Sequence, residues 1–270
     1  MNALVTTRTA HARKNCAILK IMRDGALHPG HGIVLSDLHL FARRSRATDC
    51  LRSLRADLAA ADVVVLNGDT FDFRWSTLCD HETTVAAAIE WLRALVNDLP
   101  KCRIHYILGN HDCLVAFRER LESLAGALPR LRWHEDFLRL GSALFLHGDC
   151  AHELMDPNGL RRYRAPWEND RQRGSVATSA YLVADHLGLT RLAHERQFPP
   201  RRTVERIIHY LDSARPGWQS AIGDCYFGHT HLPLSGFRHD GVVFHNSGSA
   251  IRGMAFNPIK FEIREDHAPV

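Results

Sequence analysis

Five short apolar stretches of this chain each end abruptly in polar residues, and this feature constrains the fold more than any other. Such runs are typical of buried strands, and in α/β folds the side chains with chemical roles gather where strands end. The five stretches are residues 32–35, 63–66, 103–108, 143–146 and 225–227. We therefore expect five strands that carry polar clusters at their carboxyl ends.

The first half of the chain alternates strands with helices. Apolar side chains recur near helical spacing at about 46–60, 82–98 and 114–125. This order of strand, helix and strand predicts an α/β architecture with parallel strand pairing.

The second half has more closely spaced strands. Two pairs of apolar runs, 137–140 with 143–146 and 234–238 with 242–245, are separated by only a few residues. The second pair is joined through Asp240-Gly241, a sequence that favours a tight hairpin turn. Both pairs predict hairpins, so we expect this half to be more antiparallel.

Residues 151–220 interrupt the rhythm between two of the site-bearing strands. The segment is rich in arginine, and we expect helices in it at about 175–193 and 203–214. An insertion there could overhang the strand ends as a helical cap, although two packing helices with arginine on the solvent side would give the same pattern. We expect a basic, mobile segment at 1–30 and one domain at 31–270, with 151–220 as its cap insert.

Composition limits the class of protein. Hydrophobic residues make up 45% and charged residues 24% of the chain, which excludes a disordered protein and a membrane-embedded one. The seven cysteines are odd in number and contain no CxxC pair, so they indicate a reducing compartment rather than a disulfide framework. There is no apolar run of about 18 residues and no signal-peptide pattern at the N-terminus. We expect a cytoplasmic protein without a transmembrane segment.

The polar clusters combine carboxylates, an amide and imidazoles, all of which bind metals. Histidine is abundant, at 18 of 270 residues, and it is the commonest metal ligand in proteins. Mixed oxygen and imidazole donors suit manganese, iron, cobalt, nickel or zinc, whereas oxygen donors alone would suit magnesium or calcium. One carboxylate between two half-sites can bridge two ions. The cluster residues are Asp37, His39, Asp69, Asp72, Asn110, His111, Asp112, His147, Asp149, His229 and His231.

Each cluster alone could be an ordinary turn, but together and in this order they resemble the calcineurin-like metallophosphoesterase superfamily. Its blocks read D-x-H, G-D-x-x-D, G-N-H-D/E, H and G-H-x-H. They correspond here to Asp37-Leu38-His39, Gly68-Asp69-Thr70-Phe71-Asp72, Gly109-Asn110-His111-Asp112, His147 and Gly228-His229-Thr230-His231. The resemblance covers about 32–150 and 221–264. It implies an α/β fold, a four-layer α/β/β/α sandwich of two sheets flanked by helices, with metals at the strand ends.

Carried over block by block, the resemblance implies a dinuclear metal site. One ion would be held by Asp37, His39 and His231, and the other by Asn110, His147 and His229. Asp69 would bridge the two divalent ions, for which manganese is favoured and iron, zinc, cobalt or nickel are allowed. A hydroxide that bridges the ions would be the nucleophile.

His111 is not a ligand in that scheme. It would reach the scissile phosphate and protonate the leaving oxygen, with Asp72 orienting its ring. Asp112 and Asp149 would fix imidazole or backbone geometry. The element Asn246-Ser247-Gly248-Ser249 would close the wall of the site.

We expect a hydrolase that acts on a small anionic phosphodiester, pyrophosphate or phosphomonoester. Arginine binds phosphate oxygens bidentately, so Arg161, Arg162 and Arg164 are candidate substrate contacts, although solvated surface arginines would give the same pattern. The opening Ser36-Asp37-Leu38-His39-Leu40 and the helical insert also resemble the UDP-2,3-diacylglucosamine pyrophosphohydrolase branch of lipid A synthesis. That branch carries arginine where this chain has His111, and the insert is not obviously apolar enough for two acyl chains.

Two other classes stay open. The basic charge of residues 1–30 and 151–220 favours a nuclease, but the net charge of only +4 and the lack of aromatic residues among the arginines argue against a dedicated nucleic-acid groove. A non-catalytic scaffold would have lost its ligands, whereas every block here is intact. We expect contact with a membrane surface only if the substrate is a lipid, and the sequence leaves the oligomeric state open.

Overall fold

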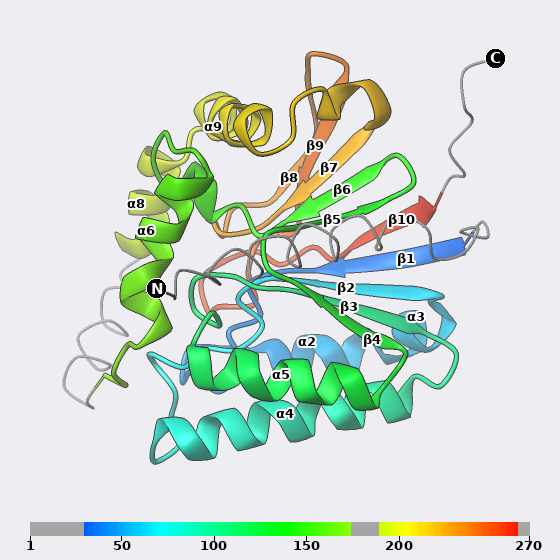
Figure 1. Cartoon of the computed structure of the whole chain (residues 1–270), viewed down its shortest axis with the longest axis vertical. Coiled ribbons are helices and arrows are strands. Elements are labelled where there is room, and N and C mark those ends of the chain that lie inside the picture. The colour runs from blue at the N-terminus through cyan, green and yellow to red at the C-terminus, as the bar shows by residue number, and fades with distance from the viewer. Residues whose placement is uncertain (1–29, 174–188, 264–270) are drawn as a thin grey trace, which may run out of the picture.

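The computed structural model describes residues 30–173 and 189–263. Within them, two five-stranded β-sheets pack face to face and helices cover both outer faces (Figure 1). This arrangement confirms the four-layer α/β/β/α sandwich that the resemblance implies. Among the described helices, none is long and apolar enough to span a membrane.

The first sheet is mostly parallel and is buried on both faces. Its strand order is β10-β1-β2-β3-β4, with β1 to β4 parallel and β10 antiparallel to β1. Because helices cover its outer face and the second sheet covers its inner face, β2 reads Val-Val-Val-Leu-Asn with every residue buried. The strands are β1 (Gly30–Leu35), β2 (Val63–Asn67), β3 (Arg103–Ile107), β4 (Leu131–His134) and β10 (Ile259–Ile263).

The helices of the first half lie where the apolar periodicity predicts them. α4 (His81–Asp98) and α5 (Val115–Ala127) agree closely with the predictions at 82–98 and 114–125. Asp80 caps α4 by accepting a hydrogen bond from the Thr83 N–H at 2.7 Å. The single helix predicted at 46–60 is instead two short helices, because the backbone at Leu54 leaves the α region (φ −91°, ψ 1°). They are α2 (Ala47–Ser53) and α3 (Arg55–Ala60).

The second sheet is mixed. In its order, β5-β6-β7-β9-β8, the two predicted hairpins are antiparallel. β6, β7 and β9 are parallel to one another, so in the second half of the chain the expected antiparallel character holds for the hairpins and for β10 but not for these three strands. The turn between β8 and β9 has positive φ at Asp240 (47°) and Gly241 (82°), as a type I′ turn requires. The strands are β5 (Phe137–Leu140), β6 (Ala143–Leu146), β7 (Asp224–Phe227), β8 (Leu234–His239) and β9 (Val242–Asn246).

Residues 151–220 contribute helices to two places in the molecule. α9 packs on the outer face of the second sheet through Val204, Ile207 and Leu211, whereas α6 and α8 lie toward the end of the sandwich (Figure 1). The α-helices are α6 (Pro157–Glu168), α8 (Leu189–Gln197) and α9 (Pro200–Ala214), and the short 3-10 turns are Asp149–Ala151 and Trp218–Ala221. The helix predicted at 203–214 lies within α9. Most of the helix predicted at 175–193, and nearly all of the segment 1–30, lie outside the described residues.

Three elements are absent from the sequence prediction: β4, β10 and α6. β10 is an edge strand in which lysine and glutamate alternate with apolar residues, so it reads as a polar surface segment. α6 contains Gly159 and Pro166, which lower intrinsic helix propensity. Asp156 nevertheless caps its first turn by accepting a hydrogen bond from the Gly159 N–H at 2.7 Å, and Leu160 and Arg164 are buried. Tertiary contacts therefore outweigh propensity in α6.

Candidate metal centre

Strands of both sheets end at one side of the sandwich, and the loops that follow them meet there. Asp37 and His39 follow β1, Asp69 and Asp72 follow β2, Asn110 and His111 follow β3, His147 follows β6, and His229 and His231 follow β7. The structure thus brings together every residue that the sequence nominates as a metal ligand or as the His111–Asp72 pair.

Five of the candidate ligands have positive φ angles, which residues other than glycine rarely adopt. The angles are 52° at Asp37, 47° at His39, 49° at Asp69, 65° at His229 and 59° at His231. Such conformations cost about 1 to 3 kcal/mol each and persist only where the surroundings hold them. Hydrogen bonds between the loops do so here: the Asp37 N–H donates to Gly68 O at 3.1 Å, and the His39 N–H donates to Asp69 O at 2.9 Å.

Glycines beside the ligands let the loops approach one another. A Cβ on Gly109 would collide with Oδ1 of Asp69, and a Cβ on Gly228 would collide with Oδ2 of Asp37. The first residue of the Gly-Asn-His-Asp block and that of the Gly-His-Thr-His block are therefore required by space.

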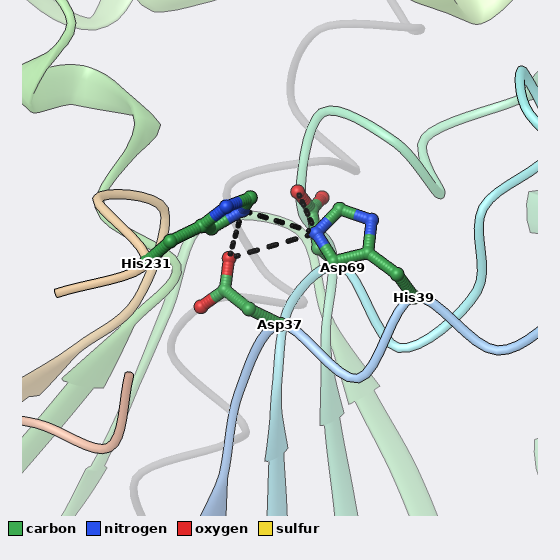
Figure 2. A group of neighbouring side chains, drawn as sticks. All are labelled: Asp37, His39, Asp69 and His231. Carbon is green, nitrogen blue, oxygen red and sulfur yellow. Dashed lines mark hydrogen bonds and ion pairs between the residues drawn. The ribbon is translucent and has the colours of Figure 1, made fainter. Parts of the chain in front are cut away.

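Four side chains form the first donor cluster, and Figure 2 shows them turned toward one another. The cluster consists of Asp37, His39, Asp69 and His231, whose ligand atoms all lie within 4.8 Å of one another. Nε2 of His231 lies 3.1 Å from Nε2 of His39 and 3.3 Å from Oδ1 of Asp37. Nδ1 of His39 faces Oδ2 of Asp72 at 3.1 Å, so this nitrogen carries the proton and Nε2 presents its lone pair to the cluster. Two carboxylates and two imidazoles around one point suit a divalent first-row metal.

The second donor cluster consists of Asn110, His147 and His229. Oδ1 of Asn110 lies 3.1 Å from Nδ1 of His229. Nδ1 of His147 donates to the carbonyl of Asn67 at 3.3 Å, so its lone pair is on Nε2. That Nε2 is buried and has no hydrogen-bond partner among the described residues, which is rare in proteins unless an ion or water completes the site. A cation between these donors would satisfy it.

Asp69 lies between the two clusters. Its Oδ2 is 3.7 Å from Nε2 of His39, and its Oδ1 is 3.4 Å from Nε2 of His147. One carboxylate thus faces both sets of donors, as a bridging ligand must.

Burial and mutual proximity perturb the ionisation of these groups. Burial, opposed by His147 and reinforced by Asp69, raises the pKa of Asp37 to about 6. Burial also lowers the pKa values of His229 and His231 well below the usual range, so both imidazoles are neutral and can bind a cation. Burial lowers the pKa of His147 too, but the carboxylates of Asp69 and Asp37 outweigh it and raise that pKa to about 10. A metal ion bound at Nε2 of His147 would take the place of the proton that this raised pKa favours, because a metal-ligating imidazole is neutral and the ion supplies the positive charge that the carboxylates attract.

Asp72 holds two imidazoles at once. Its Oδ1 accepts a hydrogen bond from Nδ1 of His111 at 3.0 Å, and its Oδ2 contacts His39 as described above. The side chain of Asp72 is fully buried, whereas that of His111 is 12% exposed, so a substrate can reach His111. Burial lowers the pKa of His111, but the charges of Asp72 and Asp69 outweigh it and raise the pKa above its usual value.

Two further polar residues fasten the loops that carry the ligands. Asp112 accepts hydrogen bonds from the Thr70 N–H at 2.8 Å and the Gly109 N–H at 2.6 Å, so it ties the loop after β3 to the loop after β2. Asn246 donates to Gly228 O at 2.9 Å and to Oγ1 of Thr230 at 3.0 Å. Both residues act on backbone geometry rather than on an imidazole.

Arg164, a candidate substrate contact, is buried and engaged with protein groups. Its Nε and Nη2 donate to the two carboxylate oxygens of Asp149 at 2.6 and 2.9 Å. Its Nη1 donates to Oδ1 of Asp136 at 3.1 Å and to Glu135 O at 2.8 Å, and Nη2 also donates to Leu108 O at 3.3 Å. These contacts favour a structural role for Arg164 over the substrate contact expected from the sequence.

The other two arginines of that group are exposed. Arg161 donates to Oδ1 of Asn158 at 2.8 Å, within α6. Arg162 lines a surface cavity of about 510 Å³ together with Glu153, Met155 and Tyr163.

Sequence reasoning missed several side chains of the segment 151–220 that contact the site. The ring of His194 stacks on that of His231 with centroids 4.7 Å apart, and the ring of Trp167 lies 4.5 Å from that of His111. Phe198 lies edge-on to His229 at 5.5 Å. No sequence motif identifies these residues, because their contacts depend on how helices distant in sequence pack against the strand-end loops.

Comparison with known proteins gives a consistent result. The model of the family described as calcineurin-like phosphoesterase matches residues 33–233. A curated relative, UDP-2,3-diacylglucosamine hydrolase of Photorhabdus laumondii subsp. laumondii, is 31% identical over 140 residues, which are 50% of this chain and 55% of the relative. The chain thus matches about half the length of that relative.

Two solved structures match this chain at low sequence identity. YfcE, a phosphoesterase from E. coli, is 15% identical with a TM-score of 0.36, and the match covers 82% of this chain and 80% of that one. A dimetal phosphatase from Danio rerio is 13% identical with a TM-score of 0.40, covering 82% of this chain and 88% of that one.

Proposed function

Because the chain belongs to the calcineurin-like phosphoesterase family, we propose that it uses two divalent ions to hydrolyse a small phosphodiester, pyrophosphate or phosphomonoester. Membership confirms both the resemblance and the enzyme class that the five motifs predict, a metal-dependent phosphoester hydrolase. The roles of individual residues and the substrate are proposals that rest on the geometry of this chain.

The observation that carries the proposal is the position of Asp69 between two donor clusters, with Nε2 of His147, which makes no hydrogen bond to a described residue, 3.4 Å from its Oδ1. In our assignment Asp37, His39 and His231 would hold one ion, and Asn110, His147 and His229 would hold the other. Asp69 would be shared by the two sites. When bound, the ions would supply Lewis acidity and lower the pKa of water toward neutrality. Among the metals that accept mixed donors we favour manganese.

His111 is the proposed general acid. Its Nδ1 proton is held by Asp72, which leaves Nε2 as the nitrogen that meets the substrate. A proton on Nε2 passes to the leaving oxygen as the P–O bond breaks, so the leaving group departs as a neutral alcohol or as a protonated phosphate. Asp72 stabilises the imidazolium before the transfer and fixes the ring afterwards. General acids of this kind contribute about 10²- to 10⁴-fold to the rate.

A narrower candidate substrate is UDP-2,3-diacylglucosamine. The observation that favours it is the Photorhabdus relative, whose name states that activity and which is 31% identical over half of this chain. A diacylated substrate would bring the protein to a membrane surface. The intact donor sets count against a non-catalytic scaffold.

We also propose that the part of residues 151–220 that contains α6 and α8 caps the site, because Trp167, His194 and Phe198 contact histidines of the strand-end loops. α9 belongs instead to the outer helical layer. A cytoplasmic location is supported by the free cysteines, of which six lie in the described part of the chain.

The test begins with protein stripped of metal by a chelator and reloaded with manganese, zinc or iron. Bound metal per chain is measured, and so is hydrolysis of bis(4-nitrophenyl) phosphate, 4-nitrophenyl phosphate and UDP-2,3-diacylglucosamine. We expect about two ions per chain and turnover that returns only with metal. Preference among the three compounds identifies the class of substrate. Failure to bind any metal stoichiometrically would revive the scaffold.

A further inference from the structure

The ring of His111 is held from three directions. Asp72 accepts its Nδ1 proton at 3.0 Å. The ring of His39 meets it edge-on with centroids 4.7 Å apart, and the ring of Trp167 lies at 4.5 Å with an interplanar angle of 50°. A single hydrogen bond leaves an imidazole able to rotate about it, whereas contacts with two neighbouring rings restrict that rotation. Asp72 and His39 belong to the motifs, but Trp167 comes from α6.

Trp167 is itself clamped. The guanidinium carbon of Arg74 lies 3.4 Å from the centroid of its ring, which is a cation–π contact. Nε of Arg74 pairs with Oδ2 of Asp170, three residues beyond Trp167. Arg74 also lies two residues after Asp72. The clamp therefore connects Trp167 with the loop after β2, whose Asp72 accepts the hydrogen bond from His111.

Hydrogen bonds to backbone carbonyls fasten the same two segments. The Arg173 N–H donates to Arg74 O at 2.8 Å. The side-chain amide of Gln172 donates to Ser76 O at 2.8 Å and to Leu78 O at 2.6 Å. The chain after α6 therefore lies along the loop after Asp72, and Trp167 is aimed at His111 by this docking.

Trp167 does not serve the hydrophobic core. It belongs to none of the three apolar clusters formed by the described residues. Its contacts are a histidine ring and a guanidinium instead. α6 also has a separate anchor in the buried pair of Arg164 with Asp149, which does not involve Trp167. Trp167 is therefore a large aromatic side chain outside the apolar clusters that packs on one imidazole. We expect its contribution to activity to act through that imidazole, His111.

We propose that Trp167, clamped by Arg74 and Asp170, is a positioning residue that holds the imidazole of His111 in the orientation required for proton transfer to the leaving group. This inference rests on the proposed function, in which His111 is the general acid. Loss of Trp167 would let the ring turn away from the leaving oxygen. The rate should then fall only where the leaving oxygen needs a proton, and substrate binding should change little.

The experiment compares wild type with Trp167→Ala, Trp167→Phe, His111→Ala and the double variant, all loaded with metal. Each is assayed on a series of phosphodiesters whose leaving groups range from nitrophenolate to simple alcohols. With alcohol leaving groups we expect Trp167→Ala to lower kcat by about 10- to 100-fold with little change in KM, within the range of a general acid. Nitrophenolate leaves without a proton, so its release should be nearly unaffected. Trp167→Phe should restore most of the loss, since it keeps a ring beside His111.

The double variant separates positioning from general damage. If Trp167 acts through His111, removing it from the His111→Ala protein lowers kcat no further. The matched control is Arg118→Ala, which removes the contact of Arg118 with Glu168 at 3.2 Å, at the same end of α6, without touching His111. It should leave kcat unchanged.

Three results would overturn the inference: wild-type kcat in Trp167→Ala with alcohol leaving groups, an equal loss with every leaving group, or full additivity with His111→Ala. The proposed function fails in a different way. A wild-type protein without metal-dependent turnover contradicts the hydrolase. A His111→Ala protein that loses the same factor with every leaving group contradicts the general acid.

Discussion

The strand-end loops and the helical segment 151–220 meet at the same site but are built differently. The loops supply every candidate metal ligand, and five of those ligands have strained, left-handed backbones that hydrogen bonds between loops hold in place. The helical segment supplies side chains that press on the ligands and on His111, such as His194 and Trp167. The comparison teaches that the chemistry is encoded in short local motifs, whereas its surroundings are encoded by long-range docking.

Arg164 joins the two regions. It lies on α6, yet its guanidinium is bonded to Asp149 after β6 and to the carbonyl of Leu108 after β3. Burial raises the pKa of Asp149, but the charge of Arg164 and its hydrogen bonds outweigh burial and lower the pKa below its usual value. Asp149 is therefore a buried carboxylate that depends on the helical segment for its counter-charge.

The strongest prediction concerns the loops. Asp69→Asn should lose both bound ions and lower turnover by about a thousandfold or more, because the bridging charge between the clusters is gone. Bound metal and kcat are measured on the same preparation. Asp57→Asn, which changes an exposed carboxylate paired with Lys260, is the control and should keep both. Full metal occupancy in Asp69→Asn would refute the bridging role.

A second change at the loops should separate chemistry from metal binding. His111→Ala should keep both ions and lower kcat by about 10²- to 10⁴-fold, since the leaving oxygen loses its proton donor. Metal analysis and steady-state kinetics test this together. Wild-type turnover in this variant would remove His111 from the mechanism.

The junction between the regions is tested by stability rather than rate. Arg164→Met should destabilise the fold by about 3 to 5 kcal/mol, because it leaves Asp149 buried without its partner. Urea unfolding measures the loss, and Arg161→Met on the exposed side of α6 should stay within about 0.5 kcal/mol of wild type. If Arg164→Met instead raised KM at unchanged stability, Arg164 would be a substrate contact after all.

The last prediction concerns the first sheet, which serves as a reference for both regions. Nδ1 of His105 lies 3.0 Å from Nε2 of His134, between β3 and β4. Burial, with the neighbouring histidine and arginines, lowers the pKa of His105 to about 3; burial and then Arg132 lower that of His134 to about 4.

Both pKa values lie below the unfolded value of about 6.5, so the unfolded chain binds more protons in acid. The stability from these neutral histidines is complete above about pH 6.5 and is lost as the pH falls toward about 4 for His134 and toward about 3 for His105. Each histidine contributes a slope of up to about 1.4 kcal/mol per pH unit in that window. The free energy of unfolding is measured at pH 7.5 and at pH 5. Its decrease between these pH values should be smaller in the double variant His105→Leu/His134→Leu than in wild type. Equal losses would mean that the pair does not resist protonation.

The sequence predicts most of the first half of the fold and the whole candidate ligand set. β1, β2 and β3 are apolar runs in sheet order. Each is followed by carboxylate, amide or imidazole side chains, which the sequence alone identifies as candidate metal ligands. α6 could not be predicted, because Gly159 and Pro166 weaken its local signal and its stability comes from the buried Arg164. The buried pairing of Arg164 with Asp149 could not be predicted for the same reason, because an arginine in a polar stretch of sequence is expected to be exposed to solvent.

The sequence by itself determined which side chains gather at the strand ends of each sheet, because parallel strands of one sheet deliver their carboxyl ends to the same edge whatever their loops contain. That the two sheets bring those edges to the same side of the molecule was decided by their packing. Only the tertiary structure decided the orientation of those side chains. Left-handed φ angles at Asp69 and His231, the unpartnered Nε2 of His147 and the ring of Trp167 against His111 all depend on atoms contributed by distant segments. Such contacts are determined by side-chain packing between distant segments. They leave no periodic pattern in the sequence from which they could be predicted.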